Sequence, residues 1–170
     1  YPTVREPDFA LTLFTRLNQP DLTLAMAGGG WQRFASQAQT ARNVLGDRFV
    51  QPGRVPPSRA AELEKNADIL VSLGNFYDNQ MPSKLFVYFG SGKPVLHLAV
   101  SESDPTLPYL ARYPLALVLH RSEGVTPEVL DRLRSWLAHV KGQRLPYEQV
   151  AALYPEFTPG RVAQDFLAAL

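Results

Sequence analysis

The stretch from Ala67 to Val95, ADILVSLGNFYDNQMPSKLFVYFGSGKPV, decides the fold class of this chain. It predicts a buried strand over residues 68–73, a polar loop, a short helix opened by Pro82-Ser83-Lys84, a glycine stop and a second buried strand. The start of such a helix presents free backbone N–H groups and a partial positive charge, which suit a phosphate. In an α/β sheet this helix start lies at the carboxyl end of the strand, where ligands of such folds bind.

The rest of the chain continues the alternation of helix and strand on both sides of this stretch. Periodicity and turn residues predict helices over 8–18, 31–43, 57–66, 105–112, 126–142 and 160–170, and strands over 22–27, 48–51, 94–100 and 115–120. Strands that are apolar throughout are typical of parallel sheets that helices cover on both faces. The sequence therefore predicts an α/β fold with one doubly wound, Rossmann-like parallel sheet in a single domain.

Composition narrows the class of protein further. The chain has 170 residues, of which 45% are hydrophobic and 19% charged, as expected of a soluble globular domain. Its net charge of +1 argues against a nucleic-acid partner bound through a large basic surface. The absence of cysteine excludes a disulfide framework and a thiolate metal site, and it fits a reducing, cytoplasmic compartment. No apolar run approaches the ~20 residues that span a bilayer, so no transmembrane segment is expected.

The segment NQMPSKLFVYFGSGKPV, residues 79–95, also carries a resemblance. It resembles the N-x-x-P-S-K-L-F-E-Y…G-K-P-V segment of GT-B glycosyltransferases similar to family 4, within their nucleotide-sugar-binding domain. In the order of its elements the resemblance covers nearly the whole chain, and its motifs are specific over residues 55–95. It implies that residues 1–170 form the C-terminal, donor-binding domain of a glycosyltransferase. Such enzymes usually transfer a sugar with retention of configuration, with a nucleotide-diphosphate sugar as substrate and without a bound metal or cofactor.

The beginning of the chain leads to an expectation about the whole protein. The first residue is Tyr1, and the strand that would precede the helix over 8–18 is absent or barely present. We therefore expect a fragment of a longer protein, whose N-terminal acceptor domain is missing from this chain. Such a fragment is expected to bind a nucleotide sugar weakly and to transfer nothing by itself. Peripheral membrane association of the full-length protein stays open, as do the donor, the acceptor and the linkage.

The candidate diphosphate site lies at the start of the helix in the decisive stretch. The resemblance implies that the backbone amides of Ser83, Lys84 and Leu85 hold the diphosphate, together with the Ser83 hydroxyl and the Lys84 ammonium. From spacing alone, an ordinary helix start with Ser as cap and Lys in solvent is the alternative. The longer match favours the diphosphate site.

Two further positions flank this helix start. In the related enzymes they are acidic and eight residues apart, and the second commonly contacts the nucleotide ribose. Here they hold Asn79, which can still form hydrogen bonds, and Val87, which cannot. Val87 shares a helix face with Ser83, so either it faces a weakened ribose site or it is a core residue and the contact lies elsewhere. Val87 also supports the alternative function, a catalytically inactive sugar-nucleotide-binding or scaffold module.

Glycines and arginines in the first third of the chain supply the remaining candidates. Gly29, in the run of glycines after the strand over 22–27, permits close approach of a ligand, although a tight turn explains it equally well. Gly53 and Arg54 resemble the G-x-V stretch that cradles the base in these enzymes, and a plain turn is again the alternative. Arg5, in YPTVREP, resembles an arginine that offers its guanidinium to the pyrophosphate.

Other side chains receive structural interpretations. His97 and His120 lie in apolar strands, where histidines are usually satisfied by a backbone hydrogen bond rather than catalytic. Glu102 and Asp104 follow a strand and either line the cleft or lie in a solvated loop. No His/Asp/Glu cluster has metal-ligand spacing, and no nucleophile motif is present. The large aromatic residues on or beside helical stripes are expected in the core: Phe14, Trp31, Trp136 and Phe166.

Overall fold

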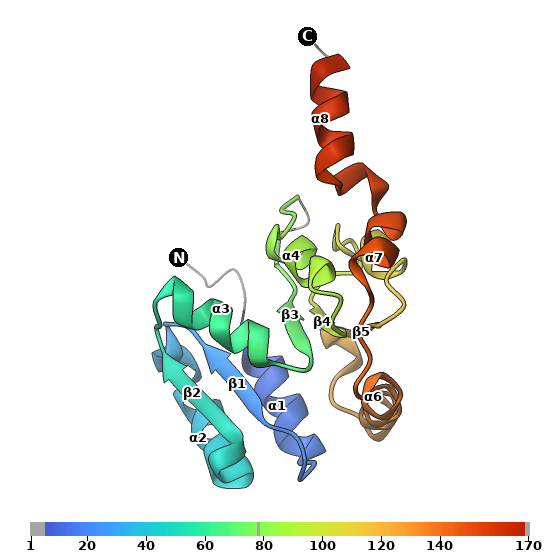
Figure 1. Cartoon of the computed structure of the whole chain (residues 1–170). Coiled ribbons are helices and arrows are strands. Elements are labelled where there is room, and N and C mark those ends of the chain that lie inside the picture. The colour runs from blue at the N-terminus through green and yellow to red at the C-terminus, as the bar shows by residue number, and fades with distance from the viewer. Residues whose placement is uncertain (1–5, 78, 169–170) are drawn as a thin grey trace.

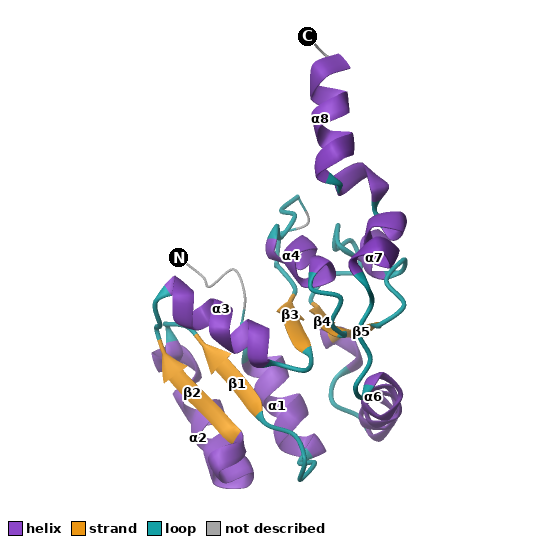
Figure 2. Cartoon of the chain, viewed as in Figure 1, coloured by secondary structure: helices purple, strands orange, loops and turns teal. Residues whose placement is uncertain are grey.

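The computed structural model describes residues 6–77 and 79–168, and it has an α/β architecture with parallel strands (Figures 1 and 2). The N-terminal half contains α1 (Asp8–Leu17), β1 (Leu24–Ala27), α2 (Ala35–Leu45), β2 (Phe49–Gly53) and α3 (Pro57–Asn66). The C-terminal half contains β3 (Leu70–Leu73), α4 (Lys84–Gly90), β4 (Val95–Ala99), α5 (Leu107–Leu110), β5 (Ala116–His120), α6 (Pro127–Val140), α7 (Tyr147–Leu153) and α8 (Pro159–Ala168). Helix and strand therefore alternate as the sequence predicts.

The strands form two parallel sheets where the sequence predicts one. β1 pairs with β2, and β3, β4 and β5 form a three-stranded sheet in that order, with Ser72, His97 and Val118 in register. Among the described residues, no hydrogen-bonded ladder connects β1 to β3, and Figure 1 shows the two sheets side by side. The α/β fold with parallel strands is thus confirmed, whereas the described residues form two separate sheets in place of the single one predicted.

Helices cover both faces of the three-stranded sheet. Leu96 and Leu98 of β4 pack against α1 and α6, whereas Val95, on the opposite face, packs against α4, α5 and α7. This division follows from the alternation of side chains along a strand. α1 also contributes Leu11 to a third cluster with β1, β2 and α2. α1 therefore packs against both sheets and holds the two halves together.

Two local differences from the predicted elements have physical reasons, and one predicted helix start is confirmed. β2 continues through Pro52 to Gly53 where a turn was predicted, because the pairing with β1 shifts there and a bulge tolerates proline. α7 was not predicted, since its seven residues are too few for a clear periodic pattern. The predicted start of α6 is confirmed, with the Thr126 hydroxyl accepting a hydrogen bond from the Val129 N–H at 3.3 Å.

The C-terminal helix departs from the prediction for its aromatic residue. Phe166 was expected in the core, but its exposed fraction on α8 is 67%. Figure 1 shows that α8 projects away from the sheets, so nothing in the described part of the chain covers its apolar side. No described helix combines the length and apolarity needed to cross a membrane.

Candidate functional site

Three of the predicted binding residues meet where β1 and β2 end. The Gly28 N–H donates to the Gly53 carbonyl at 2.8 Å, which ties the two strand ends together. A Cβ on Gly29 would lie 3.5 Å from Nε of Arg54, so the missing side chain lets the guanidinium lie against the backbone. Gly53 has a φ of +73°, which favours glycine. We call Gly28, Gly29, Gly53 and Arg54 the glycine corner; its arginine is exposed and carries a positive charge.

A second group of predicted residues surrounds the start of α4. Ser83 is the N-cap position of this helix of seven residues and Lys84 is its first residue. The Leu85 N–H already donates to the Pro82 carbonyl at 3.0 Å, and the Leu85 side chain is buried in the core. Lys84 forms an ion pair with Glu64 of α3. The Ser83 and Lys84 side chains therefore face outward. The backbone N–H of Leu85 is already hydrogen-bonded, and its side chain belongs to the core.

Val87 shares the exposed side of α4 with these two residues. Its exposed fraction is 63%, so the interpretation of Val87 as a core residue is wrong. Ser83, Lys84 and Val87 are all exposed, as expected for positions one helical turn apart, and Asn79 is exposed in the preceding loop. This part of the chain therefore presents a hydroxyl, an ammonium and an apolar side chain on one surface.

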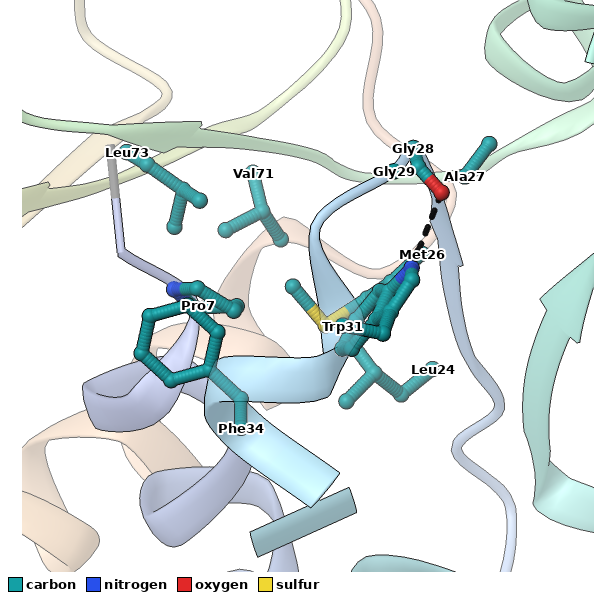
Figure 3. A pocket seen from close by; sticks show the side chains of 10 residues that line it. All are labelled: Pro7, Leu24, Met26, Ala27, Gly28, Gly29, Trp31, Phe34, Val71 and Leu73. Atoms are coloured by element: carbon teal, nitrogen blue, oxygen red, sulfur yellow. Dashed lines mark hydrogen bonds between the residues drawn. The ribbon is translucent and has the colours of Figure 1, made fainter. Parts of the chain in front are cut away.

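An apolar cavity of about 230 Å³ lies between the ends of β1 and β3. Figure 3 shows the side chains that surround it, and Gly28 and Gly29 of the glycine corner form part of its rim. Trp31 is held there by a 2.9 Å hydrogen bond from its Nε1 to the Gly28 carbonyl. The cavity adjoins the glycine corner, but its lining offers few polar groups to a ligand. Arg5 lies outside the described residues.

The end of β5 adds a charged group that sequence reasoning missed. Arg121 pairs with Asp8 at 2.5 Å and with Glu6 at 3.5 Å, and its guanidinium lies 5.8 Å from the centre of the Phe76 ring. His120 Nδ1 lies 3.2 Å from the Glu102 carboxylate, whose side chain is mostly exposed. For Arg121 the sequence signal was its position directly after the apolar strand β5, at the edge of the sheet where ligands bind.

A buried polar network connects β3, β4 and the loop after β4. His97 Nε2 lies 2.9 Å from Asp104 Oδ2, and His97 Nδ1 lies 3.1 Å from the Ser72 hydroxyl oxygen. Thr106 donates to Asp104 Oδ1 from its hydroxyl at 2.6 Å and from its backbone N–H at 2.8 Å. Burial raises the pKa of Asp104, but the hydrogen bonds from His97 and Thr106 outweigh it and lower that pKa to about 2.

This network corrects two predictions. His97 is satisfied by side chains rather than by a backbone hydrogen bond, and Asp104 is buried instead of lining a cleft or lying in solvent. A Ser–His–Asp arrangement suggests a hydrolytic triad, yet the order of contacts is reversed, since a triad joins Ser to Nε2 and Asp to Nδ1. His97 has no exposed surface, so no substrate reaches it. We conclude that the network fixes the loop after β4 in place.

Lys93, within the G-K-P-V motif, is also structural. Its buried ammonium donates to the carbonyls of Glu64, Lys65 and Ala67, at 2.8, 2.6 and 2.5 Å. Burial lowers the pKa of Lys93, and the charge of Arg144 adds to that effect. The lysine caps the last turn of α3, where carbonyl groups lack helical partners. This part of the decisive stretch thus stabilises the fold rather than presenting a cation to a ligand.

The comparisons with known proteins leave the family open. Searches against protein-family models, curated proteins and solved structures each returned no match to this chain. Among the residues that the structure describes, no group of three or more His, Cys, Asp and Glu side chains is arranged to hold a metal ion. The resemblance of residues 79–95 to glycosyltransferases therefore stays a prediction, to be judged by experiment.

Proposed function

We propose that this chain is the donor-binding domain of a glycosyltransferase and binds a nucleotide-diphosphate sugar. The observation that carries the proposal is the common location of its candidates at strand ends: the glycine corner follows β1 and β2, and the exposed Ser83 and Lys84 follow β3. In parallel sheets these ends lie on the same edge, where ligands bind. The proposed domain spans residues 1–170, and its proposed fold is Rossmann-like, with a doubly wound parallel sheet.

Each exposed group has a role that its chemistry fits. Arg54 offers a planar fork of donors and Lys84 a point charge, and both suit phosphate oxygens. Gly53 leaves the backbone open to a base or ribose, and Gly29 lets the Arg54 guanidinium lie close to the backbone. As the sugar leaves, negative charge grows on the diphosphate, and fixed cations stabilise it without a metal. The acceptor would come from an N-terminal domain outside this chain, so transfer with retention belongs to the full-length protein.

One observation favours a second candidate, a module that keeps the fold but has lost catalysis. Val87 occupies the position proposed for ribose contact, and 63% of it is exposed, so an apolar surface replaces a hydrogen-bonding group. Lys84 is moreover paired with Glu64, which competes with a phosphate for its charge. A weak or absent donor site would leave a scaffold or binding module.

Titration of the chain with UDP, GDP, ADP and their common sugar derivatives tests the proposal, with calorimetry as the readout. We expect saturable binding of one diphosphate family, weakened at least about tenfold by Arg54→Gln, as loss of a charged hydrogen bond predicts. Arg59→Gln is the matched control, because Arg59 is exposed on α3 and pairs only with Glu62 in the contacts described. Equal affinity in both variants would exclude the glycine corner from the site.

Val87→Glu separates the two candidates. If the donor site is otherwise intact, the new carboxylate accepts hydrogen bonds from the ribose and tightens binding by about 1–2 kcal/mol. If the chain is an inactive module that binds no donor, the substitution leaves the titration flat. Because Val87 is exposed, the fold tolerates either side chain, and thermal unfolding of both proteins verifies this.

A further inference from the structure

We propose that the break between β1 and β3 is the seat of one more parallel strand, which belongs to the same polypeptide and precedes Tyr1. This strand would join the two sheets into one, in the order β2, β1, added strand, β3, β4, β5. The proposal concerns an interaction surface inside the fold and does not depend on the nucleotide-sugar site.

The backbone of β3 turns hydrogen-bonding groups toward the break. The Leu70 N–H donates to Pro94 and the Gly74 N–H to Leu98, both at 2.9 Å, so these residues face β4. Amides alternate in direction along a parallel strand, which directs those of Val71 and Leu73 to the opposite side. By the same reasoning, the Gly28 bond to Gly53 directs the amides of Ala25 and Ala27 away from β2.

Space for a strand lies at both ends of the break. The apolar cavity of about 230 Å³ separates the carboxyl ends of β1 and β3, and Figure 3 shows Met26 of β1 facing it together with Val71 and Leu73 of β3. A second cavity of about 720 Å³ lies at the amino ends, lined among others by Leu22 before β1 and Ile69 before β3. The first lining is apolar, so it fits an apolar strand better than a polar ligand.

The surrounding elements are incompletely buried. α3 joins β2 to β3 and so crosses the break, yet none of its residues is buried, although Leu63 lies on it. Residues of β3 alternate between buried and partly buried, whereas every residue of β4, which has a strand on each side, is buried. A strand in the break would supply the missing neighbour to α3 and β3 alike.

The edges that face the break also lack protection. Exposed edge strands usually carry charges, prolines or bulges that prevent pairing with other strands. β2 has Pro52 and an irregular register, whereas β1 (LAMA) and β3 (LVSL) contain neither charge nor proline. These two strands therefore have the composition of internal strands.

The path of the chain identifies the occupant. Pro7, directly before α1, lines the cavity at the carboxyl ends of the strands, which is where a parallel strand leading into α1 would end. α1 and α2 pack on the same face of β1 and β2. Right-handed crossovers on that face run from β1 through α2 to β2, so a strand that precedes α1 lies on the other side of β1, in the break.

The test compares residues 1–170 with the same chain extended by the segment that its gene encodes directly before Tyr1. We expect the amides of Val71 and Leu73 to exchange with solvent at least ~100-fold more slowly in the extended protein, since new ladder hydrogen bonds protect them. The midpoint of thermal unfolding should rise by about 10 °C. Unchanged exchange of Val71 and Leu73 in the extended protein would overturn the proposal.

A charged substitution provides a measurement within the extended protein itself. Val71→Lys places an ammonium at the cavity beside the break. The gain in midpoint is the difference between the extended and unextended chains that carry the same substitution. Val71→Lys should remove most of this gain, while Val50→Lys, at an exposed position of β2, should preserve it. Equal effects of the two substitutions would contradict a strand beside β3. Protection that appears only at high protein concentration would show that a second copy fills the break, which would also refute the proposal.

Discussion

β4 and β1 are both apolar strands, but they differ in their surroundings. Every residue of β4 (VLHLA) is buried, including His97, because β3 and β5 flank it and helices cover both faces. In β1 (LAMA) only Leu24 is buried, since a single strand pairs with it. Apolar sequence thus does not decide burial by itself. Burial depends on the strands that flank a strand and on the helices that cover its faces.

The half of the molecule built on β3–β5 also buries several polar side chains. They include Ser72, His97, Lys93 and Asp104, and each of them has hydrogen-bond partners in its own half or at the end of α3. Buried polar groups without partners are costly, so these contacts require a closely fitted structure. We therefore expect substitutions in this half to have larger effects than those beside the break.

Gly92→Ala should have the largest effect. Gly92 has a φ of +71°, and a Cβ there would lie 2.1 Å from the Leu145 carbonyl oxygen, which is backbone and cannot move aside cheaply. We expect the free energy of unfolding to fall by about 3 kcal/mol or more, as measured by urea denaturation. Gly90→Ala is the control: a Cβ at Gly90 meets nothing within 4 Å, and alanine favours a helix by up to about 1 kcal/mol. Similar losses of unfolding free energy in the two variants would show that the close contact between Gly92 and Leu145 does not limit the side chain at position 92.

Paired leucine substitutions test the comparison directly. Leu96→Ala removes a fully buried side chain from β4 and should lower the free energy of unfolding by about 3 kcal/mol. Leu73→Ala, at a partly buried residue beside the break, should lower it by only about 1 kcal/mol, because less apolar surface returns to water. Denaturation of both variants under one condition gives the difference. Equal losses would mean that β3 is as tightly packed as β4.

How far the sequence predicts this structure also differs between regions. The elements around residues 67–95 are confirmed because apolar strands, Pro82-Ser83 and the glycines are local signals. The break between the sheets is not predictable from such signals, since the compositions of β1 and β3 are those of internal strands and do not indicate which strands pair. The same holds for α8, whose amphipathic pattern predicts a helix but not what covers Phe166.

The candidate site shows a similar division. Sequence placed Ser83, Lys84 and the glycine corner correctly at strand ends, because chain order fixes those positions. It could not assign Lys93 to the end of α3 or Asp104 to His97, since each contact joins segments whose approach depends on tertiary packing. Whether the exposed residues bind a donor stays a prediction.

Acid titration provides a smaller effect, specific to the half with the buried network. The pKa of Asp104 is lowered from 3.8 to about 2, so its ionised form stabilises the fold above pH 4. That contribution, about 2 kcal/mol, should be lost as the pH falls from 4 to 2. Asp104→Asn should lower stability at pH 7 and flatten this part of the pH profile. Asp131→Asn, at an exposed carboxylate, should leave the pH profile unchanged. If Asp104→Asn kept the steep loss of stability between pH 4 and 2, that loss would belong to other titrating groups.

The smallest effect concerns the contact that joins the two halves at α3. Lys93→Met keeps the apolar stem but removes the donors to Glu64, Lys65 and Ala67, whose carbonyls lie at a helix end and can turn to water. We expect a loss of about 1 kcal/mol, together with faster hydrogen exchange confined to the last turn of α3. Lys65→Met, at an exposed position of the same helix, is the control. If exchange instead rose along β3 and β4, Lys93 would support the sheet rather than the end of α3.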